Sequence, residues 1–198
     1  MEDIKMSIEK LMTILPVPEN NGMDIPDWDE IEKAIQFELP EDYKQFIAVY
    51  GLGWIDDFML VLAPGVDSNC YDLLEGGKSH LLEYIGRRLS HPDFYLHNAL
   101  ENGDGIYPWG ITDNVDTLYW QVVDGKVESI LIYNKGPAGE FFESKLAFSD
   151  FLYAILSKEV VTDHLPEDFP SEEISFVEQW RYDQDAGEER FVFLDDIK

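Results

Sequence analysis

Two aspartates and an asparagine stand just before a predicted strand, in the stretch DNVD at residues 113–116. Carboxylates this close together suit a calcium loop, an acid/base pair of the kind glycosidases use, or side-chain hydrogen bonds that close a turn. The spacing does not match the calcium-loop pattern, whose glycine is also missing. Acidic residues are so frequent in this chain that Asp113 and Asp116 can be neighbours by chance. A turn is therefore the favoured interpretation, with the acid/base pair as the alternative.

A second carboxylate pair, Asp56 and Asp57, follows a turn and is expected to form a solvated rim rather than a metal site. Trp54 and Trp109 are each expected in the core or at its edge, although a tryptophan exposed beside acids would suit a protein-interface hot spot. If the two acidic pairs lie at strand ends in one sheet, they meet at a common rim. The predicted partner-binding patch then consists of Asp56, Asp57, Trp54, Trp109, Asp113 and Asp116.

Motifs for other chemistry are missing from the sequence. It contains no G-x-S-x-G elbow, Walker A loop, G-x-G-x-x-G or H-E-x-x-H. Cys70 has no evident base beside it and is more typical of a small buried hydrophobe than of a nucleophile. None of His80, His91, His97 and His164 pairs with another histidine or cysteine at helical metal-ligand spacing. We therefore expect no metal site and no covalent chemistry.

Periodicity and capping predict the first three helices. Apolar residues at helical spacing predict a helix over residues 3–15. Asp27 and Glu30 form a capping-box pattern that begins a second helix. Pro40 suits the first position of a third helix, and Gly51 suits its end. The buried faces are predicted to be Trp28, Ile31, Ile35 and Leu39 in the second helix, and Tyr43, Phe46, Ile47 and Tyr50 in the third.

The remaining elements are shorter. Residues 58–62, FMLVL, are typical of a buried strand. Gly76 and Gly77 are predicted to split the helical pattern around them, giving one interrupted helix or two short ones. After a turn at NKGPAG, a short strand EFFE leads to a closing amphipathic helix with Ser149 as its N-cap. FVFLDD near the end of the chain could add a strand.

Asp124-Gly125 is the strongest hairpin signal in the chain and predicts a type I′ turn. A two-residue loop pairs Val122 with Val127 and Leu118 with Leu131. The apolar faces then agree across the hairpin, which supports this register.

Length and composition favour one domain with a single sizeable core, since the chain has 198 residues of which 45% are hydrophobic. No apolar stretch is long enough to span a membrane. The charged N-terminal stretch MEDIKMSIEKLM does not resemble a signal peptide, and one cysteine, Cys70, cannot form an intramolecular disulfide. A reducing cytoplasm is therefore the expected location.

The chain is strongly acidic, with 41 acidic residues against 14 basic ones and a net charge of −27. This charge argues against partners that present phosphates. We therefore expect neither nucleic acids nor anionic membranes as partners. It favours a basic protein partner, because complementary fields steer association. Solubility alone and adaptation to high salt are the alternatives.

Three segments together resemble the SUKH superfamily of bacterial immunity proteins and relatives of a yeast cell-wall-assembly regulator. The first runs from Trp28 to Phe58 and contains LPEDYKQFIAVYG followed by GWIDDF. The second is PWGITDNVDTLYWQV, in which Val115 stands where relatives commonly carry glycine. The third runs from Tyr133 to Leu156 and ends in FSDFLYAIL, and DHLPEDFP follows it.

The resemblance implies an α+β fold in which an antiparallel sheet is flanked by helices. It also implies no catalytic residue, no enzymatic activity and no cofactor, since none is typical of the family. It divides the chain into an N-terminal helix and loop (1–26), a SUKH-like domain (27–170) and an acidic C-terminal extension (171–198). It implies an immunity protein that neutralises a cognate toxin, of a class that is often basic and nuclease-like. The alternatives are a regulatory scaffold in cell-wall or glucan synthesis and a carboxylate-dependent hydrolase. The sequence identifies neither the toxin nor the oligomeric state.

Overall fold

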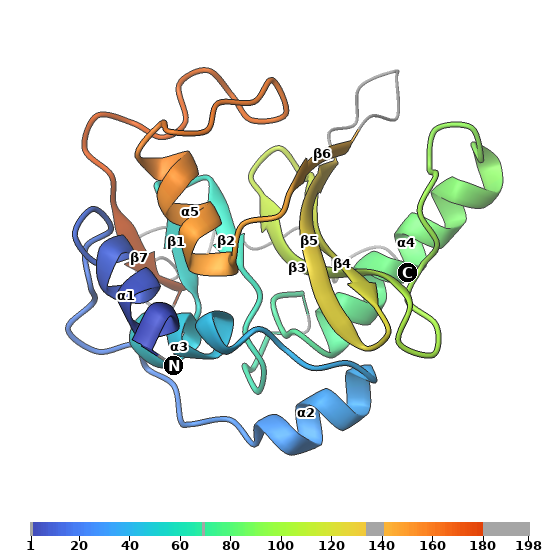
Figure 1. Ribbon diagram of the computed structural model, residues 1–198, viewed down its shortest axis with the longest axis horizontal. Helices are drawn as coiled ribbons and strands as arrows, with labels where there is room; N and C mark the ends of the chain where they lie inside the picture. Colours follow the sequence, from blue (N-terminus) through green and yellow to red (C-terminus); the bar gives the residue numbers. More distant parts are fainter. Residues whose placement is uncertain (1, 69, 134–140, 180–198) are drawn as a thin grey trace.

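The computed structural model describes residues 2–68, 70–133 and 141–179 and arranges them around one antiparallel sheet (Figure 1). The helices are α1 (Glu2–Leu11), α2 (Trp28–Ile35), α3 (Glu41–Tyr50), α4 (Glu75–Ser90) and α5 (Phe148–Leu156). The strands are β1 (Gly53–Ile55), β2 (Met59–Val61), β3 (Gly105–Thr112), β4 (Thr117–Val123), β5 (Lys126–Tyr133), β6 (Phe141–Ser144) and β7 (Phe176–Glu178). This is the α+β architecture predicted from the sequence.

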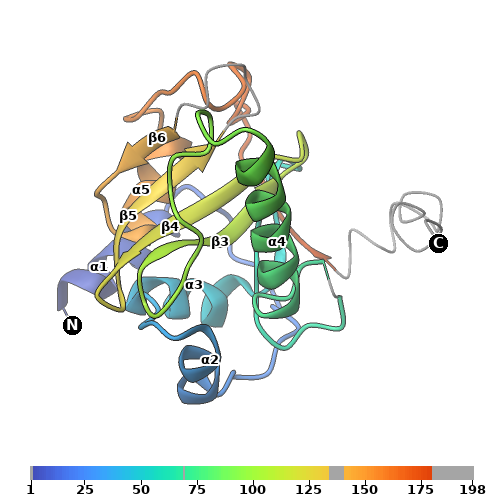
Figure 2. The same cartoon turned by 90° about the vertical axis from the view of Figure 1, so that its right-hand side faces the viewer.

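The sheet separates two layers of helices. Its strand order is β6-β5-β4-β3-β2-β1-β7, and each neighbouring pair is antiparallel. Helices α1, α3 and α5 cover one face, α4 covers the other, and α2 lies beyond the end of the sheet, below α3 in Figure 1 (Figures 1 and 2). In the part of the chain that the structure describes, no helix is long and apolar enough to cross a bilayer.

Aromatic rings fill the main core, between the sheet and helices α1, α3 and α5. The ring of Tyr43 meets those of Trp120 and Phe148 edge-on, with centroids 4.9 and 5.4 Å away, the geometry that aromatic quadrupoles favour. Its hydroxyl donates a hydrogen bond of 2.6 Å to the carbonyl oxygen of Leu62. The predicted buried face of α3 is confirmed, since the core includes Tyr43, Phe46, Ile47 and Tyr50.

A smaller core, rich in tyrosine, lies between α4 and the opposite face of the sheet. It consists of Tyr84, Tyr95, Ile106, Tyr119, Leu131 and Tyr133. The hydroxyl of Tyr84 donates a 2.9 Å hydrogen bond to the carbonyl oxygen of His97. Burial raises the pKa of Tyr84 to about 12, so this hydroxyl stays a neutral donor at physiological pH.

The predicted ends of α2 and α3 are partly confirmed. The carboxylate of Asp27 accepts a 3.2 Å hydrogen bond from the Glu30 amide, which caps the start of α2. Helix α2 ends at Ile35, earlier than predicted, because Gln36 adopts the left-handed conformation with φ 66°. Gly51 closes α3 as predicted, with φ 68° and its amide donating to a carbonyl of the last turn.

The hairpin turn between β4 and β5 is confirmed. Asp124 and Gly125 have φ values of 49° and 73°, and positive φ at both central residues defines the type I′ turn that suits twisted strands. Val122 pairs with Val127, as predicted.

The predicted register farther along this hairpin is wrong by one residue. The pairing shifts beyond Val122, which leaves Glu128 as the extra residue of a β-bulge. Leu118 therefore pairs with Ile132 instead of Leu131. The shift places Leu131 opposite Tyr119, in the tyrosine-rich core. The apolar pattern did not reveal the bulge because both faces of β5 are buried, so either register places apolar side chains in a core.

The predicted interruption at Gly76 and Gly77 is also wrong. Both glycines lie in the first turn of one continuous helix, α4. A Cβ added to Gly77 would lie 2.7 Å from the hydroxyl oxygen of Tyr107 on β3. The glycine therefore permits close packing of the helix on the sheet and does not break the helix.

The prediction that Ser149 is the N-cap of α5 is wrong. The N-cap position is Ala147, which makes no side-chain cap, and Ser149 lies within the first turn. The carboxylate of Asp42, from α3, accepts a 2.7 Å hydrogen bond from the Ser149 amide. A residue 107 positions away in sequence thus satisfies one of the free amides at the start of α5.

The two ends of the described chain pack onto the central unit. Helix α1 ends at Leu11, short of the predicted residue 15, and contacts α3 and α5. Strand β7, within the predicted acidic extension, pairs with β1 and completes the sheet. The stretches NKGPAG and FVFLDD lie outside the described residues.

Candidate functional site

The two acidic stretches form turns at the same end of the sheet. Asp56 and Asp57 are the central residues of the β1–β2 turn, with φ values of 55° and 51°. The Phe58 amide closes this turn by donating a 3.1 Å hydrogen bond to the carbonyl oxygen of Ile55. Asparagine and aspartate tolerate the left-handed conformation better than most residues, which explains why two aspartates occupy these positions.

The DNVD stretch forms the neighbouring β3–β4 turn, so the turn interpretation is confirmed. The Thr112 amide donates to the carbonyl oxygen of Asp116 at 3.0 Å, and the Val115 amide donates to that of Thr112 at 2.9 Å. The Asp113 amide donates a 2.8 Å hydrogen bond to the carbonyl oxygen of Phe58. This bond joins the two acidic turns side by side, at the common rim that the sequence analysis anticipated.

Val115 adopts a strained backbone conformation at this rim. Its φ is 62° and its side chain is 66% exposed. A β-branched residue is unfavourable in the left-handed region. Glycine would adopt this conformation without strain.

The four predicted rim aspartates have different roles. The carboxylate of Asp56 accepts hydrogen bonds from the amide and the hydroxyl of Ser171, at 2.6 and 2.8 Å. Asp116 is buried and closes its turn through its backbone. Asp57 and Asp113 have exposed side chains. The structure therefore makes Asp56 and Asp116 structural and leaves Asp57 and Asp113 facing solvent.

Neither predicted tryptophan reaches the surface as an anchor. Trp54 is 7% exposed, and its indole nitrogen donates a 2.7 Å hydrogen bond to the side-chain oxygen of Gln179. Trp109 is fully buried and packs edge-on against Phe148 and Phe151. The expectation that both tryptophans lie in the core is confirmed, and the alternative of an exposed aromatic anchor at the rim is wrong.

Two acids that the sequence analysis did not assign to the rim join it. The contact of Ser171 with Asp56 brings the exposed residues after it, Glu172 and Glu173, to this end of the sheet. We use the term acidic rim for Asp57, Asp113, Glu172 and Glu173. No local pattern predicts the contact, because it joins residues 115 positions apart.

A groove of about 1090 Å³ opens at the other end of β1 and β2. One wall consists of the loop before α2 and its first turns, within residues 21–34, and the other consists of the loop at residues 64–68. Leu52, Leu74 and Gln179 also line it. Leu52 directly precedes β1 and residues 64–68 follow β2, whereas the acidic rim lies at the turn that joins these strands.

Asn21 fixes the first wall of the groove. Its side-chain nitrogen donates a 2.7 Å hydrogen bond to the carbonyl oxygen of Ala48 in α3, and its side-chain oxygen accepts one of 3.1 Å from the Met23 amide. A Cβ on Gly51 would lie 2.5 Å from the carbonyl oxygen of Asn21. The loop therefore packs tightly on the end of α3, and only glycine allows that approach.

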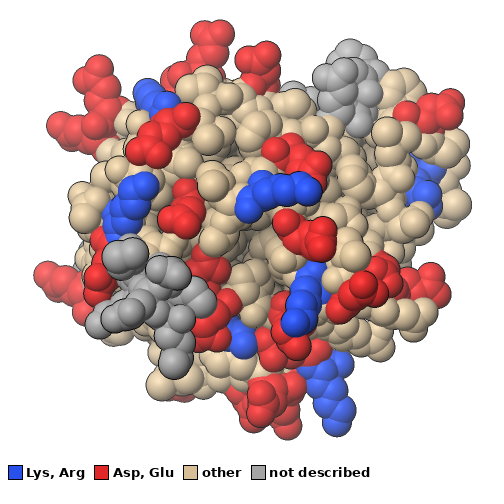
Figure 3. Space-filling view, in the orientation of Figure 1, with Lys and Arg blue, Asp and Glu red and all other residues tan. Residues whose placement is uncertain are grey.

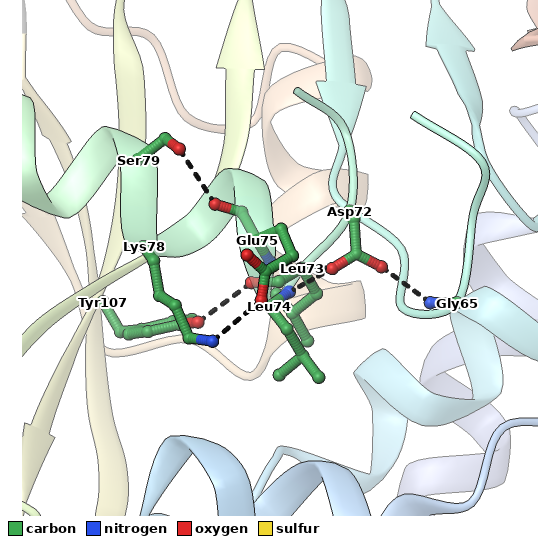
Figure 4. A network of polar contacts seen from close by, with 8 residues as sticks. All are labelled: Gly65, Asp72, Leu73, Leu74, Glu75, Lys78, Ser79 and Tyr107. Carbon is green, nitrogen blue, oxygen red and sulfur yellow. Dashed lines mark hydrogen bonds and ion pairs between the residues drawn. The ribbon is translucent and has the colours of Figure 1, made fainter. Parts of the chain in front are cut away.

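Asp72 fixes the second wall (Figure 4). One carboxylate oxygen accepts a 2.8 Å hydrogen bond from the Gly65 amide in the loop. The other accepts hydrogen bonds of 2.8 Å from the amides of Leu74 and Glu75, at the start of α4. In the same network Tyr107 donates a 2.9 Å hydrogen bond to the carbonyl oxygen of Leu73. The loop, helix α4 and strand β3 are thus held as one unit.

Negative charge dominates the lining of the groove. Its charged residues are Asp24, Asp27, Glu30, Lys33 and Asp67, which makes four acids against one base. Over the molecule as a whole, carboxylates crowd the margins of the face in Figure 3, and Lys and Arg are few and interspersed. No local sequence pattern reveals the groove, because its two walls lie about 40 positions apart in sequence.

Potential metal-binding side chains do not cluster in the part of the chain that the structure describes. No three His, Cys, Asp or Glu side chains there are grouped so that they could hold a metal ion. Cys70 is half-buried with a free thiol. Burial lowers the pKa of His97, whose ring packs against Phe141. What the arrangement offers is two acidic surfaces on a rigid sheet, which suits binding.

In three comparisons with known proteins, no family model, no curated protein and no solved structure matches the chain.

Proposed function

We propose that this protein is an immunity protein that binds a cognate basic toxin and neutralises it by stoichiometric occlusion. The observation that carries the proposal is the acidic rim. Two hydrogen-bonded turns hold Asp57 and Asp113 at one end of the sheet in a chain of net charge −27. The order of motifs that resemble the SUKH superfamily supports the same function, and so does the α+β fold.

The proposed mechanism is electrostatic competition. A nuclease-type toxin presents Lys and Arg where nucleic-acid phosphates bind. Carboxylates held on rigid turns can occupy those positions, and they lose little conformational entropy in doing so because their backbones are already ordered. The field of a strongly acidic protein also speeds the encounter with a basic partner. This function needs one immunity protein for each toxin molecule and no turnover.

The proposal is tested by co-expressing the chain with the product of the gene next to its own. We expect growth to be rescued only when the chain is at least equimolar with that product, and a complex of one copy of each to be isolated. If growth is rescued when the chain is present in far smaller amount than the adjacent gene product, the chain acts catalytically. Absence of any complex would contradict the proposal.

The rim is tested with the double variant Asp57→Asn and Asp113→Asn, which leaves the structural carboxylates of Asp56 and Asp116 intact. The rate at which this variant associates with the adjacent gene product should fall by about tenfold, because rim charges act mainly on the encounter of the two proteins. The association rate should also depend less on salt concentration. A matched control, Asp93→Asn with Glu101→Gln, removes the same charge from exposed positions elsewhere in the chain. Equal association rates for the two variants would exclude the rim as the interface.

A further inference from the structure

The acidic rim lacks the two tryptophan anchors that the sequence predicted for it. Interface affinity is concentrated in a few apolar or aromatic anchors that are fully removed from water. Trp54 and Trp109, the predicted anchors, are both buried in the core. The rim can therefore attract a basic partner through its charge, but neither tryptophan is available there as an anchor.

The groove at the other end of β1 and β2 has an apolar lining in which side chains of a partner could be buried. Apolar side chains contribute much of its lining, including Met23, Ile31, Leu52, Val66 and Leu74. Ile25 also lines it and is 90% exposed, the highest value among the exposed large apolar residues. Its volume, about 1090 Å³, is sufficient for several side chains of a ligand. An exposed apolar surface with polar margins is typical of an interaction site.

Both walls of the groove are fixed before any ligand arrives. Asn21 holds the loop before α2 against α3, and Asp72 holds the loop at residues 64–68 against α4. Binding in a preformed groove avoids the entropy cost of ordering its walls.

We propose that this groove is the docking site for a basic, amphipathic segment of the protein partner. The apolar side chains of this segment enter the groove, and its Lys or Arg side chains contact the carboxylates of the groove. The inference rests on the proposed function in one respect, namely that the partner is basic. The negative charge of the groove favours a basic segment, because Asp24, Glu30 and Asp67 are exposed and the groove is lined by one lysine.

Two other occupants are disfavoured by the same charge. The chain's own C-terminal residues, 180–198, carry six acidic and three basic residues, a net charge of −3. A second copy of the chain carries −27. Both would bring negative charge to a negative groove.

The test measures binding of synthetic peptides to the full-length chain. The probe is a short peptide with leucines on one face and Lys and Arg on the other. One comparison peptide has the same composition in scrambled order, and another has Glu in place of every basic residue. We expect the probe to bind about tenfold or more tightly than the scrambled peptide, because only the probe can bury its leucines together. The Glu peptide should not bind.

Groove variants are compared with a matched rim variant. Asp24→Asn, Glu30→Gln and Asp67→Asn together, and Ile25→Ser alone, should each weaken probe binding by about tenfold or more. The control, Asp57→Asn, Asp113→Asn and Glu172→Gln, removes the same charge from the rim and should change probe binding by less than about threefold. Unchanged thermal midpoints would show that all variants are folded.

Hydrogen exchange of the full-length chain separates the possible occupants. The probe should slow exchange within residues 21–34 and 64–68. If Ile25→Ser instead speeds exchange in residues 180–198, the chain's own C-terminal segment occupies the groove and the proposal is wrong. It is also wrong if the wild-type chain dimerises and the groove variants do not, or if the groove and rim variants lose probe binding equally.

Failure of this inference differs from failure of the proposed function. If the adjacent gene product forms a one-to-one complex that groove variants do not weaken, the groove is not the docking site, but the proposed immunity function is still supported. If the peptide binds the groove but growth is not rescued and no complex forms, the proposed function falls.

Discussion

Buried and exposed carboxylates in this protein have different surroundings. Asp72 and Asp42 are buried, and each accepts hydrogen bonds from backbone amides at the start of a helix. Asp57 and Asp113 are exposed on turns and face solvent. A buried carboxylate must be satisfied by donors, whereas an exposed one can remain hydrated until a partner arrives. Position in the fold therefore decides what each acid does.

Asp72→Ala should lower the free energy of unfolding by about 2–3 kcal/mol, because it leaves three amides without their charged acceptor. Asp67→Ala, at an exposed position of the adjoining loop, should cost less than about 0.5 kcal/mol. Urea unfolding of both variants measures the difference. Equal costs would show that the Asp72 network does not hold the groove wall.

Asp42 should make stability depend on pH. Burial, the largest cause, raises the pKa of its carboxyl above the ordinary value of 3.8, and the hydrogen bond from Ser149 only partly opposes this. As pH rises from about 4, the unfolded chain loses this proton before the folded chain does, so unfolding becomes easier up to the raised pKa of Asp42. Asp42→Asn cannot titrate but can still accept the Ser149 hydrogen bond.

The Asn variant should therefore gain stability relative to wild type as pH rises from about 4 to about 7. Chemical unfolding at each pH measures the difference, and Glu41→Gln, an exposed acid in the same turn of α3, is the control. A difference between Asp42→Asn and wild type that is constant with pH would contradict the assignment.

Helix α4 shows how one residue type has different roles within one element. Gly77 lies against Tyr107, where a Cβ would come within 2.7 Å of the hydroxyl oxygen, whereas nothing lies within 4 Å of a Cβ added to Gly86. The first glycine permits packing on the sheet. The second has no such packing role and lowers helix propensity.

Gly77→Ala should therefore destabilise the protein by about 1–3 kcal/mol through overpacking. Gly86→Ala should stabilise it by about 0.5–1 kcal/mol, since alanine is the better helix former. Thermal and chemical unfolding of the pair measures both changes. Stabilisation by both substitutions would mean that α4 does not pack closely on β3.

At the scale of the whole molecule, net charge is the dominant feature. A charge of −27 on 198 residues opposes compaction through self-repulsion. The few ion pairs in the described part of the chain, such as Lys44 with Glu32 at 2.7 Å, cannot balance it. The same field that would attract the proposed basic partner therefore lowers the stability of the free protein.

Salt should consequently stabilise the free protein. Raising NaCl from about 0.01 M to about 0.1 M shortens the Debye length from about 30 to about 10 Å, so the thermal midpoint should rise. Glucose at the same osmolality does not screen charge and serves as the control. A midpoint that falls with NaCl would show that favourable ion pairs outweigh the repulsion.

The sequence by itself determined the features that arise from neighbours along the chain. The cap at Asp27, the type I′ turn at Asp124-Gly125 and the buried face of α3 follow from dihedral preferences and from side-chain periodicity. The α+β class was expected from the resemblance of the motifs to a known superfamily, and the acidic surface follows from composition. For the candidate site, the sequence located two acidic turns and anticipated their shared rim.

Only the tertiary structure decided the contacts between distant segments. The cap that Asp42 provides for α5, the bond of Asp56 to Ser171 and the pairing of β7 with β1 join residues more than 100 positions apart. The groove likewise exists only because Asn21 and Asp72 fix two separate loops. Local preferences act over about one helical turn or one hairpin. Which distant carboxylate meets which amide is set by how the whole chain packs its core, and no short stretch of sequence contains that information.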